Sequence, residues 1–221
     1  MIYITGDVHG DLGRFRQGRL RWLGKKDTVI VLGDFGFVWD GGREEQKALA
    51  WLAKRRCTIL FLDGCNENYD LLARYPVTEA FGGRVQNLGG NVYHVCRGSV
   101  LTLEGRKILC FGGGETVDKE EREPGVNWWK EEMPTSEEYA YCEQNLEACG
   151  HQVDYVLTHD APTKLLDFTG LPEHEVNRLH CFLDKVILET DYKKWYFGRY
   201  HRDLTLSRKA ACVFRGVLAL E

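Results

Sequence analysis

Aspartate and histidine residues recur directly after short apolar runs that are typical of β-strands. Five such blocks occur along the chain: Gly6-Asp7-Val8-His9-Gly10, Gly33-Asp34, Asp63-Gly64-Cys65-Asn66-Glu67, Thr158-His159-Asp160 and Gly198-Arg199-Tyr200-His201. A single aspartate or histidine after a strand is more often a cap or turn residue than a ligand, so the indication comes from the repetition. Imidazole nitrogen and carboxylate oxygen atoms together suit Zn, Mn, Fe or Ni, and a bridging carboxylate suits a pair of metal ions.

The elements that must position these residues alternate between strand and helix patterns. Apolar runs at 1–5, 28–32 and 58–62 each precede a helix-like segment, at 10–23, 43–55 and 66–75. Such alternation predicts a sheet of parallel strands covered by helices. Ligands gather beyond the carboxyl ends of such strands. One rim of the sheet should therefore hold Asp7, His9, Asp34 and the pair Cys65-Asn66.

The second half of the chain has a different pattern. Runs at 92–96, 99–103 and 106–111, joined by short turns, predict a β-meander. Helices are expected at 136–149 and 174–189, strands at 154–157 and 194–197, and two short strands within 204–220 around a turn at 207–209. The segment 112–134 is either a lid or insertion loop over the substrate, or a loop whose Trp128 and Trp129 pack onto the sheet. The usual burial of tryptophan favours packing.

Length and charge limit the class of protein. With 221 residues, 43% of them hydrophobic, we expect a single domain over 1–221. The chain has 29 basic and 33 acidic residues and a formal net charge of -4. The basic runs Lys25-Lys26 and Arg55-Arg56 are short and are interpreted as solvated surface. Nucleic acid is therefore disfavoured as a partner, because proteins that bind its phosphates usually show a basic excess.

Cysteine spacing and hydropathy bear on the compartment. The eight cysteines show no close CxxC spacing, and Cys57, Cys96, Cys110 and Cys212 lie in apolar runs, which indicates buried free thiols. No charged-then-apolar signal segment opens the sequence, and no apolar stretch approaches membrane-spanning length. We expect a cytoplasmic protein with no membrane partner, and the sequence leaves its oligomeric state open.

The five blocks, in this order and with this spacing, resemble the calcineurin-like metallophosphoesterase family, and the resemblance spans residues 6–203. It implies a four-layer α/β/β/α sandwich, in which two mixed β-sheets are flanked by helices. It also implies one or two divalent metal ions (Mn, Fe, Zn or Ni) and a metal-activated water that hydrolyses a phosphomonoester or phosphodiester. The substrate would be a small phosphate ester or a nucleotide. By the family pattern, Asp7, His9 and His201 hold one metal, Asp34 bridges both metals, and His159 holds the second.

Three positions depart from the family pattern, all in the half of the site that serves the second metal. The family has Gly-Asn-His after the third strand, whereas this chain has Gly64-Cys65-Asn66. Cys65 thus stands where the family has a ligand asparagine, and Asn66 where it has a catalytic histidine. In the last block, Arg199 replaces a histidine ligand, and an arginine does not lose its proton to serve as one. A thiolate at Cys65 could bind a soft metal, or a small backbone shift could aim Asn66 at the metal.

These departures lead to a mechanistic hypothesis. One metal, held by the residues assigned to the first position together with Asp34, activates water. Arg199 supplies fixed charge in place of the second cation and grips the substrate phosphate, with Asn66 as a second substrate contact. Asp34, Asn66 and Arg199 are the expected catalytic residues, and Cys65 is kept as a further candidate ligand. The alternative is a non-catalytic nucleotide- or metal-binding module with a degenerate phosphoesterase site.

Overall fold

The computed structural model describes residues 1–166 and 175–221, and its strands form two mixed sheets. The first sheet has the order β13-β1-β2-β3-β6-β5-β4. Its strands are β1 (Ile2–Thr5), β2 (Thr28–Val31), β3 (Thr58–Phe61), β4 (Val77–Ala80), β5 (Gly83–Gly89), β6 (Val92–Val95) and β13 (Leu218–Ala219). The neighbours β1, β2, β3 and β6 run parallel, so the carboxyl ends of β1, β2 and β3 lie at one edge, as the alternation of strands and helices predicts.

The second sheet has the order β11-β12-β10-β9-β8-β7. Its strands are β7 (Ser99–Leu103), β8 (Arg106–Phe111), β9 (Tyr155–Thr158), β10 (Lys194–Phe197), β11 (Leu204–Ser207) and β12 (Ala210–Cys212). The central strands β8, β9, β10 and β12 are parallel to one another, whereas β7 and β11 are antiparallel edge strands. The ends of β9 and β10 therefore deliver His159 and Arg199 to the same edge of this sheet.

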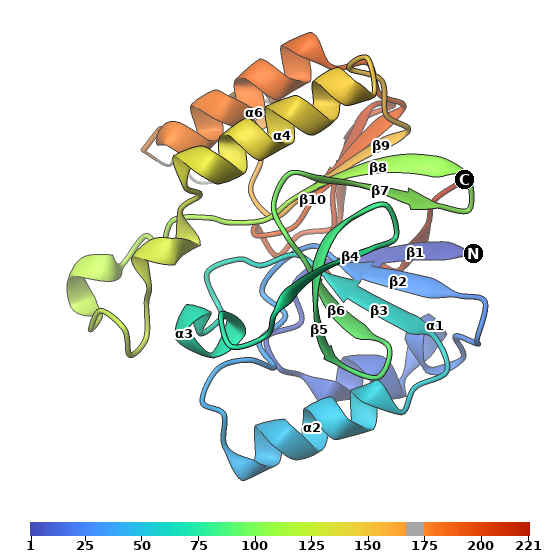
Figure 1. Ribbon diagram of the computed structural model, residues 1–221, viewed down its shortest axis with the longest axis vertical. Coiled ribbons are helices and arrows are strands. Elements are labelled where there is room, and N and C mark those ends of the chain that lie inside the picture. Colours follow the sequence, from blue (N-terminus) through green and yellow to red (C-terminus); the bar gives the residue numbers. More distant parts are fainter. Residues whose placement is uncertain (167–174) are drawn as a thin grey trace.

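Helices cover the outer face of each sheet, which gives four layers (Figure 1). The 3₁₀ turn η1 (Leu12–Arg16) and the helices α1 (Gly18–Arg21) and α2 (Arg43–Ala53) lie under the first sheet, whereas α4 (Ser136–Ala148) and α6 (Arg178–Glu189) cover the second. Shorter elements are α3 (Tyr69–Leu72), α5 (Thr163–Leu166), η2 (Lys119–Glu121) and η3 (Lys130–Glu132). The expected α/β/β/α sandwich of two mixed β-sheets is confirmed.

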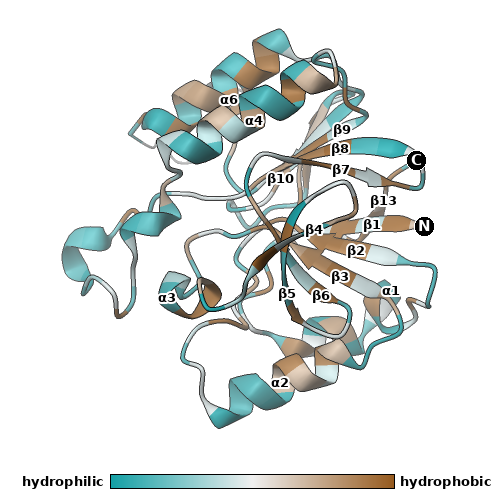
Figure 2. Cartoon of the chain, in the orientation of Figure 1, coloured by the Kyte–Doolittle hydropathy of each residue, from teal (hydrophilic) through white to brown (hydrophobic). Residues whose placement is uncertain are grey.

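The apolar core follows from this layering. One cluster fills the space between the sheets and includes Ile4, Leu60, Leu101 and Leu157. Two further clusters lie under the helices, and Figure 2 shows apolar strands between helices whose outer faces are polar. All four residues of β1 and of β9 are buried because both faces of each central strand are covered. All eight cysteines are free, and Cys57, Cys110 and Cys212 are buried as expected, whereas Cys96 is only partly buried.

The expected β-meander at 92–111 is wrong, because β6 and β7 belong to different sheets. β6 pairs with β3 and β5, and the chain then crosses to the second sheet at Arg97-Gly98, where β7 and β8 form a hairpin. Gly98 has φ +81°, and a Cβ there would lie 2.8 Å from the backbone of Cys142 in α4. The short turn therefore changes sheets, which hydropathy alone does not reveal. The antiparallel pair β4 and β5 was not predicted.

Two expected helices are shorter than their apolar patterns. The segment 10–23 divides into η1 and α1, because the backbone is extended at Gln17 between them and Gly18, the first residue of α1, has φ +52°. The segment 66–75 is helical only in α3, where Asn68 caps the helix through the backbone N–H of Leu71. α6 begins at Arg178, and the start expected at 174 lies outside the described residues. In the tail, β11 and β12 flank the expected turn, whereas β13, which pairs with β1 in the first sheet, was not predicted. The other strand and helix predictions agree with the structure to within about two residues. Within the described chain, no helix combines the length and hydrophobicity needed to cross a bilayer.

Candidate metal centre

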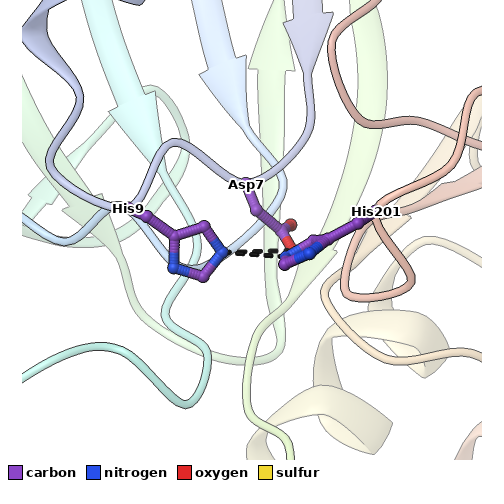
Figure 3. Close-up of side chains that lie close together, drawn as sticks. All are labelled: Asp7, His9 and His201. Carbon is purple, nitrogen blue, oxygen red and sulfur yellow. Dashed lines mark hydrogen bonds and ion pairs between the residues drawn. The ribbon is translucent and has the colours of Figure 1, made fainter.

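Asp7, His9 and His201 converge on one point beyond the carboxyl ends of β1 and β10 (Figure 3). Nε2 of His9 lies 2.9 Å from Nε2 of His201, and Nε2 of His201 lies 3.1 Å from Oδ2 of Asp7. One ligand atom from each of the three residues falls within 4.8 Å of the others. The strand-end blocks therefore meet as the sequence predicts, although they are separated by 192 residues.

Asp34 joins this cluster from the loop after β2. Its Oδ2 lies 3.7 Å from Nε2 of His9, and its Oδ1 lies 3.4 Å from Nε2 of His159. Oδ1 also accepts hydrogen bonds from the backbone N–H groups of Cys65 (2.6 Å) and Asn66 (3.0 Å). Asp34 thus has one oxygen toward each predicted half of the site, which is the position of a bridging carboxylate.

The atoms that face the predicted ions lack ordinary partners. Nδ1 of His159 lies 3.0 Å from the carbonyl oxygen of Leu32, which can only accept, so Nδ1 carries the proton. The bare Nε2 then faces a carboxylate oxygen of Asp34, and it is buried without a hydrogen-bond partner among the described residues. Two hydrogen-bond acceptors that face each other in a buried site can both bind one cation. These residues therefore suit a divalent metal ion as ligands.

The protonation of Asp7 supports the same interpretation. Burial raises the pKa of Asp7, but the hydrogen bonds from His201 and from the backbone of Arg199 help to outweigh this effect and lower it, so Asp7 is a carboxylate. In turn, the hydrogen bond and charge of Asp7 raise the pKa of His201. A metal ion binds the neutral form of histidine, so metal and proton compete for His201.

The backbone around the centre adopts conformations that are unusual for residues with side chains. Positive φ angles occur at His9 (+49°), Asp34 (+45°), Arg199 (+63°) and His201 (+51°). Each costs on the order of 1–2 kcal/mol. Such strain at four residues of one site indicates that packing holds the ligands in place for a function.

Gly64 permits the close approach of the loops that carry these ligands. A Cβ at this position would lie 2.2 Å from Oδ1 of Asp34 and 2.6 Å from Nε2 of His159. Any side chain here would therefore push the Asp34 carboxylate away from the His159 imidazole.

Arg199 lies where its sequence position predicts, beside Cys65 and near His159. Its Nη1 donates a hydrogen bond to Sγ of Cys65 (3.0 Å), and its Nη2 donates one to the carbonyl oxygen of Glu115 (2.5 Å). Nε lies 3.4 Å from Oδ2 of Asp160. The Asp160 charge outweighs burial and raises the pKa of Arg199, so the guanidinium is a fixed positive charge. Burial raises the pKa of the Cys65 thiol, and its sulfur faces Arg199 outside the cluster of three metal-binding groups.

Two cavities flank the cluster and divide the other predicted residues. A cavity of about 390 Å³ is lined by Asp34, Cys65, His159, Arg199 and His201. A second, of about 430 Å³, is lined by residues that include His9 and Asn66. Asn66 and Arg199, the two predicted substrate contacts, therefore line different cavities on either side of the metal-binding groups.

The segment 112–134 forms part of the first cavity. Glu115, Thr116, Val117, Asp118 and Arg122 line it. Trp129 is buried, donates a hydrogen bond from Nε1 to Asp70, and stands edge-on to Trp39. Trp129 thus anchors the segment 112–134 by packing, whereas the middle part of this segment projects from the sandwich (Figure 1).

Two buried carboxylates that support the site were given no role from the sequence. Glu67 accepts hydrogen bonds from the backbone N–H groups of Phe35, Gly36 and Gly64, and so fixes the two loops around Asp34. Asp160 binds Arg199 and accepts a hydrogen bond from Tyr200 (2.7 Å). His180 of α6 completes this arrangement, with Nε2 lying 3.2 Å from Asp160. The position of both acids in the strand-end blocks was the only signal in the sequence. Their burial is visible only in the structure.

Comparison with known proteins places the chain in a family. The profile of the calcineurin-like phosphoesterase family matches residues 1–206, so the chain belongs to this family. Its members typically bind divalent metals and hydrolyse phosphate esters. No curated protein matches the chain.

Two solved structures resemble the fold at low sequence identity. One is a Staphylococcus aureus protein provisionally described as a 5'-nucleotidase, with 16% identity and a TM-score of 0.49. That match covers 100% of this chain and 51% of the other, so the chain spans about half the length of that protein. The other is a phosphopantetheinyl hydrolase from Mycobacterium tuberculosis, with 13% identity, a TM-score of 0.41, and coverage of 96% and 89% of the two chains.

Proposed function

We propose that this protein is a metal-dependent hydrolase of a phosphomonoester or phosphodiester, with a small phosphate ester or a nucleotide as substrate. The observation that carries the proposal is the convergence of Asp7, His9 and His201, with Asp34 beside them, at the rim of the sandwich. A divalent cation bound there would stabilise charge on a phosphoryl oxygen and lower the pKa of a water molecule.

The chain's own residues divide the remaining work. Asp7, His9, His201 and Asp34 would hold the firmly bound cation, and the second oxygen of Asp34 lies toward His159. The second half of the site then keeps only Asp34 and His159 as ligands, because the sulfur of Cys65 is engaged by Arg199. We therefore propose one tightly bound metal per chain, with any second ion held weakly.

Arg199 would supply the positive charge that the weak second position lacks. Three of its five N–H groups are directed at Cys65, Glu115 and Asp160, which leaves one on Nη1 and one on Nη2 for phosphoryl oxygens. Because the guanidinium is held in the cavity wall, its charge needs no reorganisation as the substrate reacts. Asn66, on the other side of the cluster, is the proposed contact for the leaving group.

The test is hydrolysis of p-nitrophenyl phosphate and bis(p-nitrophenyl) phosphate with Mn, Ni, Fe, Co or Zn supplied in turn. Activity that disappears in Asp34→Ala supports an enzyme. The matched control is Asp40→Ala, which changes a nearby acidic residue outside the cluster. Nucleotide binding without turnover under every metal would instead favour a non-catalytic module.

A further inference from the structure

A second group of functional side chains gathers at the opposite end of the first sheet. Residues 16–26 contain five basic side chains and no acidic one: Arg16, Arg19, Arg21, Lys25 and Lys26. The run Lys54-Arg55-Arg56 precedes β3, as Lys25-Lys26 precedes β2, so both runs stand at the amino ends of parallel strands. Helix α2 leads from the site end of the sheet to this end (Figure 1). Its eleven residues span about 16 Å.

The run Lys54-Arg55-Arg56 and the segment 21–24, which leads to Lys25-Lys26, border one hollow of about 530 Å³. Six residues define it, and we term it the basic–tryptophan face: Arg21, Trp22, Trp51, Lys54, Arg55 and Arg56. No acidic side chain lines it. Arg55 is partly structural, because its Nη2 donates hydrogen bonds to the carbonyl oxygens of Leu20 and Arg21 and so joins α1 to the end of α2.

The exposure of Trp22 indicates that this face contacts a partner. It is 76% exposed, and no other aromatic side chain in the described residues is exposed to a comparable degree. The guanidinium of Arg21 lies 5.0 Å from its ring, and those of Arg16 and Arg55 lie 5.2 and 5.3 Å from the ring of Trp51. Tryptophan is mostly buried in proteins, so a bare indole between cations is a surface suited to contact.

The charge of the face is not neutralised by the protein itself. Lys25, Lys26, Lys54 and Arg56 form no ion pair with a carboxylate in residues 1–166 and 175–221. The nearest acid along the chain, Asp27, pairs with the amino group of Met1. A ligand that brings several negative charges to the face would therefore replace water around the unpaired cations Lys54 and Arg56.

We propose that the basic–tryptophan face binds single-stranded nucleic acid. The exposed indole ring of Trp22 beside unpaired cations matches the chemistry of such a strand, because its bases stack on aromatic rings while its phosphates pair with Lys and Arg. Trp22 stacks on a base, and Lys54 and Arg56 contact neighbouring phosphates. A hollow flanked by cations on both sides suits a strand better than the flat surface of a membrane, which is the other polyanion to consider.

This inference departs from the expectation drawn from the sequence. The net charge of -4 and the shortness of each basic run disfavoured nucleic acid. Folding joins the two runs, so the relevant quantity is the local charge of the face and not the charge of the chain. The inference does not rest on the proposed hydrolase activity, because the face and the metal centre lie at opposite ends of the sheet.

The experiment measures anisotropy of a fluorescein-labelled oligothymidine of about 20 nucleotides, a length that fills one or more such sites. The full chain is used with its metal, and strand integrity is checked on a gel. Three variants are compared with the wild type. Trp22→Leu keeps an apolar side chain without the ring, Lys54→Gln/Arg56→Gln removes two charges, and Arg208→Gln/Lys209→Gln removes two charges from the exposed turn between β11 and β12.

We expect saturable binding that Trp22→Leu weakens roughly 5- to 150-fold, the loss of one stacked base. In Lys54→Gln/Arg56→Gln, the slope of log K against log salt should fall in magnitude by about 1.4, which corresponds to two lost phosphate contacts on a single strand. The control variant should match the wild type.

Several results would overturn the inference. They are the absence of saturable binding at low salt, equal loss in the control variant, and no effect of Trp22→Leu. Tighter binding to phosphatidylserine vesicles than to the oligonucleotide would likewise overturn it in favour of a membrane partner. Hydrolysis of the chromogenic esters should be unchanged in Trp22→Leu, so failure of this inference and failure of the proposed function are distinguishable.

Discussion

Replacement of Arg199 by lysine tests the proposal that the Arg199 guanidinium takes the place of a second metal ion. The guanidinium directs three N–H groups at Cys65, Glu115 and Asp160 and leaves two for a phosphoryl group. Lysine keeps the charge but offers three donors from a single atom, so it cannot hold both the protein and two phosphate oxygens. Losing one charge-assisted hydrogen bond, worth about 1.5–3 kcal/mol, predicts a roughly 10- to 150-fold fall in kcat/KM.

The assay is steady-state hydrolysis of bis(p-nitrophenyl) phosphate, with metal content measured on the same preparation. Metal content should stay at the wild-type value, because Arg199 binds no metal in this account. Arg202→Lys is the matched control, since Arg202 is exposed three residues further along the chain. In Arg199→Ala, millimolar guanidinium should restore part of the lost activity. Activity of Arg199→Lys within twofold of the wild type, or loss of the metal in this variant, would refute the reasoning.

Three further predictions concern residues that support the site. Elemental analysis of Cys65→Ala should show the tightly bound metal still in place. Loss of the metal in this variant would show that Cys65 is a ligand. Glu67→Ala leaves three backbone N–H groups without their acceptor. Each costs about 1–3 kcal/mol, so urea denaturation should show a large loss of stability, and Glu67→Gln a smaller one; equal stability of Glu67→Ala and wild type would contradict this. Burial raises the pKa of Asp63, but the charge of Arg97 and the hydrogen bond to His94 outweigh it and hold the pKa well below its usual range. The stability that this shift contributes is present above the unfolded-state pKa of about 3.9 and is lost as pH falls below it. The difference in unfolding free energy between wild type and Asp63→Asn should therefore shrink by up to about 1.4 kcal/mol per pH unit below about pH 4. A difference that does not change with pH would show that Asp63 is not the ionised partner.

The position of the metal centre could be predicted because strand ends are local features. An apolar run that stops at a Gly-Asp pair places Asp7 or Asp34 beyond a strand, and parallel pairing brings those ends to one edge. Residues from both halves of the chain then meet without any knowledge of side-chain packing. Repetition of one local pattern was sufficient for this part of the site.

Contacts that depend on how the chain crosses between the sheets could not be predicted. The hydropathy of β6 and β7 is alike, and only the turn at Gly98, which packs against α4, sends them to different sheets. The contact between Arg199 and Cys65 joins residues 134 positions apart and depends on the positive φ of Arg199. Likewise, Lys25-Lys26 and Arg55-Arg56 appear as separate short runs until parallel pairing sets β2 beside β3.

The most direct test of the central claim is the metal content of the purified protein after desalting, measured by elemental analysis beside His201→Ala. This account predicts one tightly bound divalent ion per chain in the wild type and none in the variant, because His201 completes the cluster with Asp7 and His9. Two tightly bound ions in the wild type, or an undiminished ion in His201→Ala, would contradict it.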